Sequence, residues 1–211
     1  MIEASMPQTE RPARKIRGRL SSPRFVSFFL VQGLGAANDN AFKIALSLFL
    51  LSNLPDEASQ VRFASLAQFL FPLPFLLFSP LAGFLADRYG KGRMIFFTKF
   101  PEVLAMSLAI AAFGAGSSVL LMTALFLMAL QSAFFSPVKY GLLPESLEPR
   151  DLSMGNGILQ MTTNLSILLG TAAGVFIYER FDHRPEQIGI TLLCAALVGT
   201  VAALYVPRTP A

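Results

Sequence analysis

Six long apolar stretches follow one another along this chain of 211 residues, with short polar segments between them. A helix needs about 20 mostly apolar residues to cross about 30 Å of hydrocarbon, and each stretch approaches or exceeds that length. The pattern therefore predicts an all-helical membrane protein with six transmembrane helices in one bundle. The stretches run approximately from Phe25 to Leu51, Phe63 to Ala86, Met94 to Ala115, Val119 to Leu143, Gly157 to Tyr178 and Ile188 to Val206.

Composition agrees with this pattern, because 54% of the residues are hydrophobic and only 14% are charged. Such values are too apolar for a soluble domain of this length. We expect three parts: a basic N-terminal tail over residues 1–24, the six-helix bundle over 25–206, and a short C-terminal end over 207–211. The lone Cys194 has no partner for a disulfide and is interpreted as a packing residue.

The net charge of +4 is concentrated on alternate connections between the stretches. If the N-terminus is cytoplasmic, that side of the membrane holds 11 basic residues and the other side holds Arg62, Arg180 and Arg184. This asymmetry follows the positive-inside rule and predicts that both termini are cytoplasmic. The basic tail "RPARKIRGR" also permits a nucleic-acid interpretation, but its role as a topology determinant explains it fully.

A signal peptide is an alternative interpretation of the N-terminal region. The basic tail, the apolar run from Phe25 and the small residues Gly35 and Ala37 resemble a signal peptide with its cleavage site. Apolar character resumes directly after Asn40, however, so cleavage would divide one good span in two. We therefore expect a retained first helix.

Prolines are frequent in the second, third and fourth stretches. Proline breaks a hydrogen bond within a helix, and membrane helices tolerate it where neighbouring helices satisfy the freed backbone groups. The pattern indicates bent helices around a cavity, although kinks that only serve the packing explain any single proline equally well. The prolines concerned are Pro72, Pro74, Pro80, Pro101 and Pro137.

The fifth stretch contains "GTAAG", with glycines at Gly170 and Gly174. This GxxxG spacing lets the backbone of another helix approach closely. It predicts that one face of the fifth helix packs against protein.

An acidic residue between two amides interrupts the first stretch at "NDNAFK". Asp39 lies about 21 Å into the span, since it follows Phe25 by 14 residues at about 1.5 Å per residue. Asp39 and Lys43 are four positions apart on the same helical face, which permits a local ion pair. The flanking Asn38 and Asn40 provide amides that are able to coordinate a cation or to hold a polar head group.

Further charges lie near the cytoplasmic ends of the third and fourth stretches. Lys99 and Glu102, three positions apart, also permit an ion pair, and Lys139 lies within "FFSPVKYG". An ionisable side chain at membrane depth costs about 2.5 to 3.5 kcal/mol, so each is a functional candidate. The alternative is that these groups neutralise one another or extend to the interface and only stabilise the bundle.

The segment "GFLADRYGKGRMI" joins the second and third stretches on the side that we expect to be cytoplasmic. Gly83 would allow close helix packing, Asp87 would cap the second helix, and Gly90 with Gly92 would turn the chain tightly. This segment resembles the signature loop of the major facilitator superfamily. The matching positions are Gly83, Asp87, Arg88, Gly90 and Arg93.

Three more stretches narrow the resemblance to the lysophospholipid transporter branch of that superfamily. They are "NDNAFK", "FFSPVKYGLLPESL" and "GNGILQ". The resemblance implies a transporter that flips lysophospholipids across the bacterial inner (plasma) membrane, and family members are often fused to acyltransferase or acyl-carrier-protein synthetase domains. We find neither enzyme in this sequence: the only His183 would need an Asp where Ile188 stands, and no metal cluster or nucleotide-binding loop is present. We therefore expect no enzymatic activity, no catalytic residue and no resident cofactor or metal.

The superfamily fold has twelve helices in two halves, and this chain corresponds to the first six, which form two inverted three-helix repeats. The resemblance therefore implies a partner: a missing C-terminal half, a separate chain or a second copy. The candidate substrate and coupling residues are Asn38, Asp39, Asn40, Lys43, Lys99, Glu102, Lys139 and Tyr140.

Among them, Lys139, Lys99 and Lys43 are expected to attract the head-group phosphate. Asp39 is expected to receive the head-group amine or a coupling cation, either a proton or sodium. Two other functions remain open: efflux of small amphipathic compounds, and a truncated or scaffold protein that does not transport.

Overall fold

The computed structural model describes residues 22–206, and every regular element in this range is a helix. The predicted all-helical fold is therefore confirmed. Most of the predicted basic tail and all of the predicted C-terminal end, with Arg208, lie outside the described residues. The helices are α1 (Pro23–Asn53), α2 (Glu57–Leu70), α3 (Leu73–Tyr89), α4 (Lys91–Gly114), α5 (Ser118–Ser146), the short 3-10 helix η2 (Pro149–Asp151), α6 (Leu152–Phe181) and α7 (Glu186–Ala203).

Local sequence explains where several helices begin and end. Pro23 occupies the first turn of α1, where its missing N–H is not needed. Asp56 caps α2 by accepting a hydrogen bond from the Ser59 backbone N–H at 2.9 Å and one from the Ser59 hydroxyl at 2.8 Å. These two bonds lower the pKa of the exposed Asp56 carboxyl. Gly90, with φ of 78°, makes the turn between α3 and α4.

The second apolar stretch forms two helices, because the regular helix is interrupted between Leu70 and Leu73. Pro72 and Pro74 stand at this break and cannot donate backbone hydrogen bonds. Phe71 and Pro72 between the two helices keep helical dihedral angles, so the regular helix is interrupted while the chain continues in the same helical sense. The predicted bend stays a prediction. Pro101 and Pro137, in contrast, lie inside the continuous helices α4 and α5.

Five helical segments in residues 22–206 are long and apolar enough to cross a membrane. They are Glu57–Tyr89, Lys91–Gly114, Ser118–Ser146, Pro149–Phe181 and Glu186–Ala203. The 31-residue α1 is not among them, since polar residues such as Gln32, Asp39 and Lys43 lower its hydropathy. The predicted number of six spans therefore stays a prediction.

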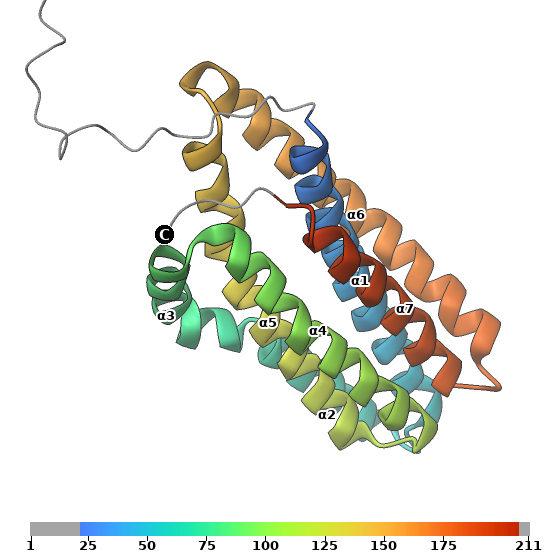
Figure 1. Ribbon diagram of the computed structural model, residues 1–211. Coiled ribbons are helices and arrows are strands. Elements are labelled where there is room, and N and C mark those ends of the chain that lie inside the picture. Colours follow the sequence, from blue (N-terminus) through green and yellow to red (C-terminus); the bar gives the residue numbers. More distant parts are fainter. Residues whose placement is uncertain (1–21, 207–211) are drawn as a thin grey trace, which may run out of the picture.

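The helices pack in two connected groups (Figure 1). α1 lies along α6 and α7, α5 lies between α3 and α4, and contacts between α4 and α7 join the groups. Gly170 and Gly174 of α6 face α1: a Cβ added at these positions would lie 2.7 Å from Ala37 Cα and 2.8 Å from Ala41 Cα. The predicted close contact of the GxxxG face is confirmed, and its partner is α1.

Two apolar cores lie at opposite ends of the bundle, separated by a polar layer. One core gathers α1 from Ala41 onward and α4 from Ala105 onward, and the other contains Phe25 to Val31 of α1 with Met94 and Ile95 of α4. The same division recurs along α5 and α7. We call the group between the cores the polar layer: Gln32, Asn38, Asp39, Thr98, Lys99, Glu102, Gln131 and Ser132.

Candidate functional site

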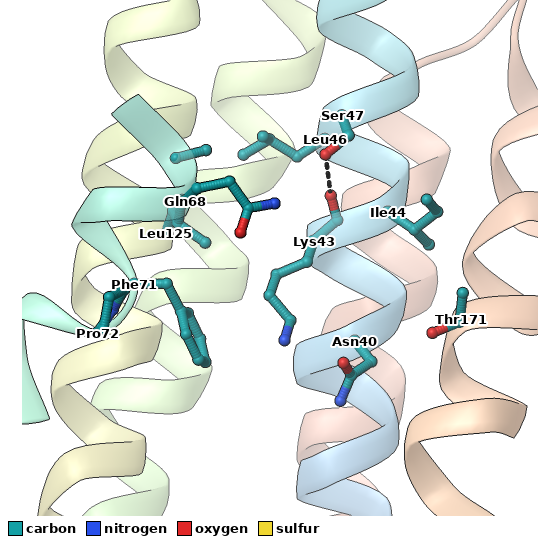
Figure 2. Close-up of a pocket in the computed structure, with 11 residues that line it drawn as sticks. Asn40, Lys43, Ile44, Leu46, Ser47, Gln68, Phe71, Pro72, Leu125 and Thr171 are labelled. Atoms are coloured by element: carbon teal, nitrogen blue, oxygen red, sulfur yellow. Dashed lines mark hydrogen bonds between the residues drawn. The ribbon is translucent and has the colours of Figure 1, made fainter. Parts of the chain in front are cut away.

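Two hollows meet at the polar layer, and we name them the Asp39 hollow and the Ser47 hollow. The Asp39 hollow has a volume of about 210 Å³ and the Ser47 hollow about 410 Å³. Asn40, Lys43 and Phe71 line both of them. In the Ser47 hollow, the Lys43 side chain extends from α1 toward the Phe71 ring, which stands at the break between α2 and α3 (Figure 2).

Asp39 and Lys43 both line the Asp39 hollow but do not form the ion pair that their spacing permits. Within residues 22–206 no ion pair of 4.0 Å or less joins them. The Asp39 carboxylate instead accepts a hydrogen bond from the Ser132 hydroxyl of α5 at 2.5 Å. The Lys43 ammonium lies 4.3 Å from the centroid of the Phe71 ring, a cation–π contact. Asp39 and Lys43 therefore each contact a residue from another part of the chain and not each other.

The two amides beside Asp39 have different surroundings. Asn38 is 3% exposed, and neither its amide nitrogen nor its carbonyl oxygen has a hydrogen-bond partner among the described residues. Asn40 lines both hollows and donates a hydrogen bond to the Ala36 carbonyl at 2.7 Å. Successive helical residues project about 100° apart, and here Asn40 shares the Asp39 hollow with Asp39 while Asn38 is buried in the bundle.

Lys99 and Glu102 form the predicted ion pair, with 2.6 Å between Nζ and Oε2. Both side chains are 1% exposed, so the pair belongs to the interior of the bundle and does not extend to an interface. Gly35 of α1 and Gly199 of α7 leave room for the Lys99 ammonium: a Cβ at either glycine would lie 3.4 Å from Nζ. Gln131 of α5 donates a longer hydrogen bond, 3.4 Å, to the same Glu102 oxygen.

Lys139 and Tyr140 are adjacent in sequence but differ in position. Lys139 lines the Asp39 hollow, and its ammonium lies 5.0 Å from the centroid of the Tyr140 ring. Tyr140 is 52% exposed and does not line either hollow. The hollow therefore brings together five residues of the predicted set, while Tyr140 does not line it. They are Asp39, Asn40, Lys43, Lys99 and Lys139.

The signature loop occupies the turn between α3 and α4. Gly90 makes the tight turn as predicted, but Gly92 lies inside α4 and has no positive φ. A Cβ at Gly83 would meet no atom of the described residues within 4 Å, so the close packing expected there stays a prediction. Asp87 does not cap a helix; it pairs with Lys91 at 3.2 Å. Arg88 and Arg93, the other two residues of the motif, are exposed.

Several candidate functional residues were not identified from the sequence. Lys91 also pairs with Glu145 near the end of α5, and Gly141 leaves space for the Lys91 side chain. Ser132 and Gln131 contact the buried carboxylates, and Gln32 donates to Thr163 of α6 at 2.9 Å. The signal for them in the sequence is the occurrence of polar residues within apolar spans. It did not identify their partners, because each lies on a different helix.

A comparison with protein families shows to which family the chain belongs. The sequence model of the Major Facilitator Superfamily matches residues 28–211. The chain therefore belongs to the major facilitator superfamily, and with its apolar helices it is a multi-pass membrane protein.

Within that class, the chain is similar to proteins named Lysophospholipid transporter LplT. The relative from Klebsiella pneumoniae subsp. pneumoniae is 29% identical over 194 residues, which cover 91% of this chain and 45% of the relative. Those from Escherichia fergusonii and Salmonella arizonae are 30% and 31% identical, with 86% and 90% of this chain and 43% and 44% of the relative covered. The resemblance inferred from the sequence is confirmed. The chain spans less than half the length of these relatives.

Proposed function

We propose that this chain forms the N-terminal half of a transporter that moves lysophospholipids across the bacterial inner membrane. The observation that carries the proposal is the Asp39 hollow, in which the Asp39 carboxyl group and three lysines, Lys43, Lys99 and Lys139, line the same space. A lysophospholipid head group requires a cationic partner for its phosphate and, where it carries an amine, an anionic partner. The similarity to proteins named as lysophospholipid transporters supports the same substrate class.

In this proposal the chain crosses the membrane six times, with α2 and α3 together forming the second span. Both termini are cytoplasmic, as the distribution of basic residues indicates. α1 to α4 and α5 to α7 are the two inverted three-helix repeats. The residues that border the ends of the described chain, Pro23 and Val206, line one common hollow, which agrees with an even number of crossings.

A second half is proposed to cover the side of the bundle where α3 and α6 border the Asp39 hollow. Phe75 of α3 and Ile167 of α6 line that hollow on its two flanks. Both helices carry large apolar side chains that are exposed in the chain alone, and the chain spans about 45% of its Klebsiella relative. The exposed residues include Leu76, Leu77, Phe84, Leu165, Leu168 and Phe176.

The roles of the lysines follow from their partners. Lys43 and Lys139 make cation–π contacts and, within residues 22–206, no ion pair of 4.0 Å or less, and they are proposed to bind the phosphate. Lys99 is better assigned to stabilising the bundle, because its ammonium is buried and paired with Glu102. Asp39 is proposed to receive the head-group amine, and the acyl chain would lie against Phe75 and the neighbouring apolar residues.

Uptake of labelled lysophosphatidylethanolamine tests this function. The chain is expressed with the C-terminal half of the Klebsiella relative in cells that lack their own transporter. Lys139→Ala and Asp39→Asn should each reduce uptake about tenfold or more, since one charge-assisted hydrogen bond contributes about 1.5 to 3 kcal/mol. Arg62→Ala removes an exposed cation on α2 that lines neither hollow, and it serves as the matched control. Parent rates for both hollow variants, at equal membrane levels, would refute the site.

A competition panel separates lipid flipping from efflux of small amphipathic compounds. Only lysophospholipids should reduce uptake of the labelled lipid if the proposal holds. Equal competition by unrelated amphipathic cations would favour efflux. No uptake with any C-terminal half would favour a scaffold.

A further inference from the structure

One hydroxyl group in the polar layer lies between two hydrogen-bond acceptors. Ser132 Oγ is 2.5 Å from Asp39 Oδ2 and 3.0 Å from Gln131 Oε1. A serine hydroxyl has a single hydrogen to donate, although its oxygen also accepts. It therefore satisfies one of these acceptors and leaves the other without a donor, unless a further proton is present.

The neighbouring ion pair determines which atom of Gln131 faces the hydroxyl. Gln131 Nε2 is 3.4 Å from Glu102 Oε2, the oxygen that also accepts from Lys99. An ionised carboxylate only accepts hydrogen bonds, so the Gln131 amide nitrogen must face Glu102 and its oxygen must face Ser132. The Gln131 oxygen consequently needs a donor, and Ser132 is the group in position to supply it.

Asp39 lacks the partners that an ionised carboxylate needs in an apolar bundle. Its Oδ1 is shielded from solvent and has no hydrogen-bond partner among the described residues. Lys43 of α1 and Lys139 of α5 line the same hollow without an ion pair of 4.0 Å or less to Asp39, and Lys99 of α4 is paired with Glu102. A buried charge without such partners is costly. The lining residues from the remaining elements, Phe71, Phe75, Thr163 and Ile167, carry no titratable group.

We infer that Asp39 is a proton-binding site, and that a bound proton completes a chain of hydrogen bonds from Asp39 through Ser132 and Gln131 to Glu102. With the proton on Oδ2, Asp39 donates to Ser132 Oγ, Ser132 donates to Gln131 Oε1, and Gln131 donates to Glu102. When the proton leaves to water in the hollow, the Ser132 hydrogen turns to Asp39. Gln131 Oε1 then loses its donor, and a negative charge appears in the hollow.

This inference rests on the proposed function only for its consequence in transport. With Asp39 neutral, the charged groups that line the hollow among the described residues are Lys43, Lys139 and Lys99, of which Lys99 is paired with Glu102, and this favours phosphate. An ionised Asp39 adds a partner for an amine. Binding of an amine-bearing head group would therefore release a proton from Asp39.

Infrared spectroscopy tests the proton site without any lysophospholipid substrate. The chain is reconstituted in liposomes, and difference spectra are recorded as the pH is raised from about 6 to about 9. Exposed carboxylates ionise near pH 4, so they contribute no carboxylic acid band in this range. We expect a protonated carboxylic acid band that disappears on alkalinisation and that Asp39→Asn abolishes.

Two further variants keep the test decisive if Asp39→Asn folds poorly. Ser132→Ala retains the acid but removes its acceptor, so the band should remain and shift to higher frequency. Glu145→Gln, a carboxyl at the end of α5 outside this chain of hydrogen bonds, should leave the band unchanged. Absence of any such band in the parent, or a band that sodium rather than pH removes, would overturn the inference. Because no lysophospholipid is present, a failure of transport alone leaves this result unaffected.

Discussion

Two lysines of α4, eight positions apart, form ion pairs in opposite environments. Lys99 pairs with Glu102 in the polar layer, where both side chains are 1% exposed. Lys91 pairs with Asp87 and Glu145 at the loop end of the bundle, and these partners are 80% and 40% exposed. The same type of ion pair therefore contributes differently to stability in the two places. In the interior, removing one partner leaves a charge with no water, whereas at the loop end solvent compensates for most of the loss.

The largest expected effect is at the interior pair. Lys99→Met should lower the free energy of unfolding by about 3 to 5 kcal/mol, because Glu102 would remain as an uncompensated buried charge. Thermal unfolding in detergent measures the loss. The double variant Lys99→Met with Glu102→Met should recover most of it, since two apolar side chains of similar volume replace the pair. If the single variant were as stable as the double variant, the interior pair would not be a coupled unit.

A smaller effect is expected at the loop end. Lys91→Met should lower the free energy of unfolding by about 1 kcal/mol, because its partners are solvated once the lysine is gone. The difference from the parent should shrink further at high salt, which screens exposed charges. Unfolding measured at two salt concentrations tests this. If high salt left this difference in the free energy of unfolding unchanged, the Lys91 pairs would be shielded from solvent in the same way as the Lys99 pair.

Two glycines extend the comparison, because each lies beside one of the lysines. A Cβ at Gly199 would make an ordinary contact of 3.4 Å with Lys99 Nζ, so Gly199→Ala should stabilise α7 by about 0.5 to 1 kcal/mol. A Cβ at Gly141 would overlap Lys91 and displace it from its partners. Gly141→Ala should therefore show no net gain. Equal stabilisation of both variants would show that Lys91 moves aside without cost.

The smallest expected effect is at Asp87. Asp87→Asn should change the free energy of unfolding by about 0.5 kcal/mol or less, because Asp87 is 80% exposed and Lys91 keeps Glu145. The same melting experiment measures it. A loss as large as that of Lys91→Met would show that Asp87, and not Glu145, is the main partner of Lys91.

The bounds of the helices were predictable because transmembrane helix formation depends on local apolar length. The first stretch, expected from Phe25 to Leu51, became Pro23–Asn53, and the sixth, from Ile188 to Val206, became Glu186–Ala203. The second stretch was predicted to bend, but its division at Phe71 and Pro72 was not. Proline weakens a helix locally, and whether it bends or breaks depends on the neighbouring helices.

The candidate site was only partly predictable for a related reason. The spacing of Lys99 and Glu102 gave the correct pair, whereas the same kind of argument gave the wrong partner for Asp39. Asp39 contacts Ser132, which is 93 positions away, and Lys43 contacts Phe71 at the helix break. Spacing shows which residues share a helix face, but it does not show which side chain of another helix reaches that face.

The sequence by itself determined the helical elements, the membrane class and the family motifs. These properties depend on local composition and on the fixed rise of a helix. Only the tertiary structure decided that polar positions on α1, α4 and α5 coincide in one layer between two apolar cores. That coincidence depends on how far each helix is shifted along its neighbours, and packing at positions such as Gly170 against Ala37 sets that shift.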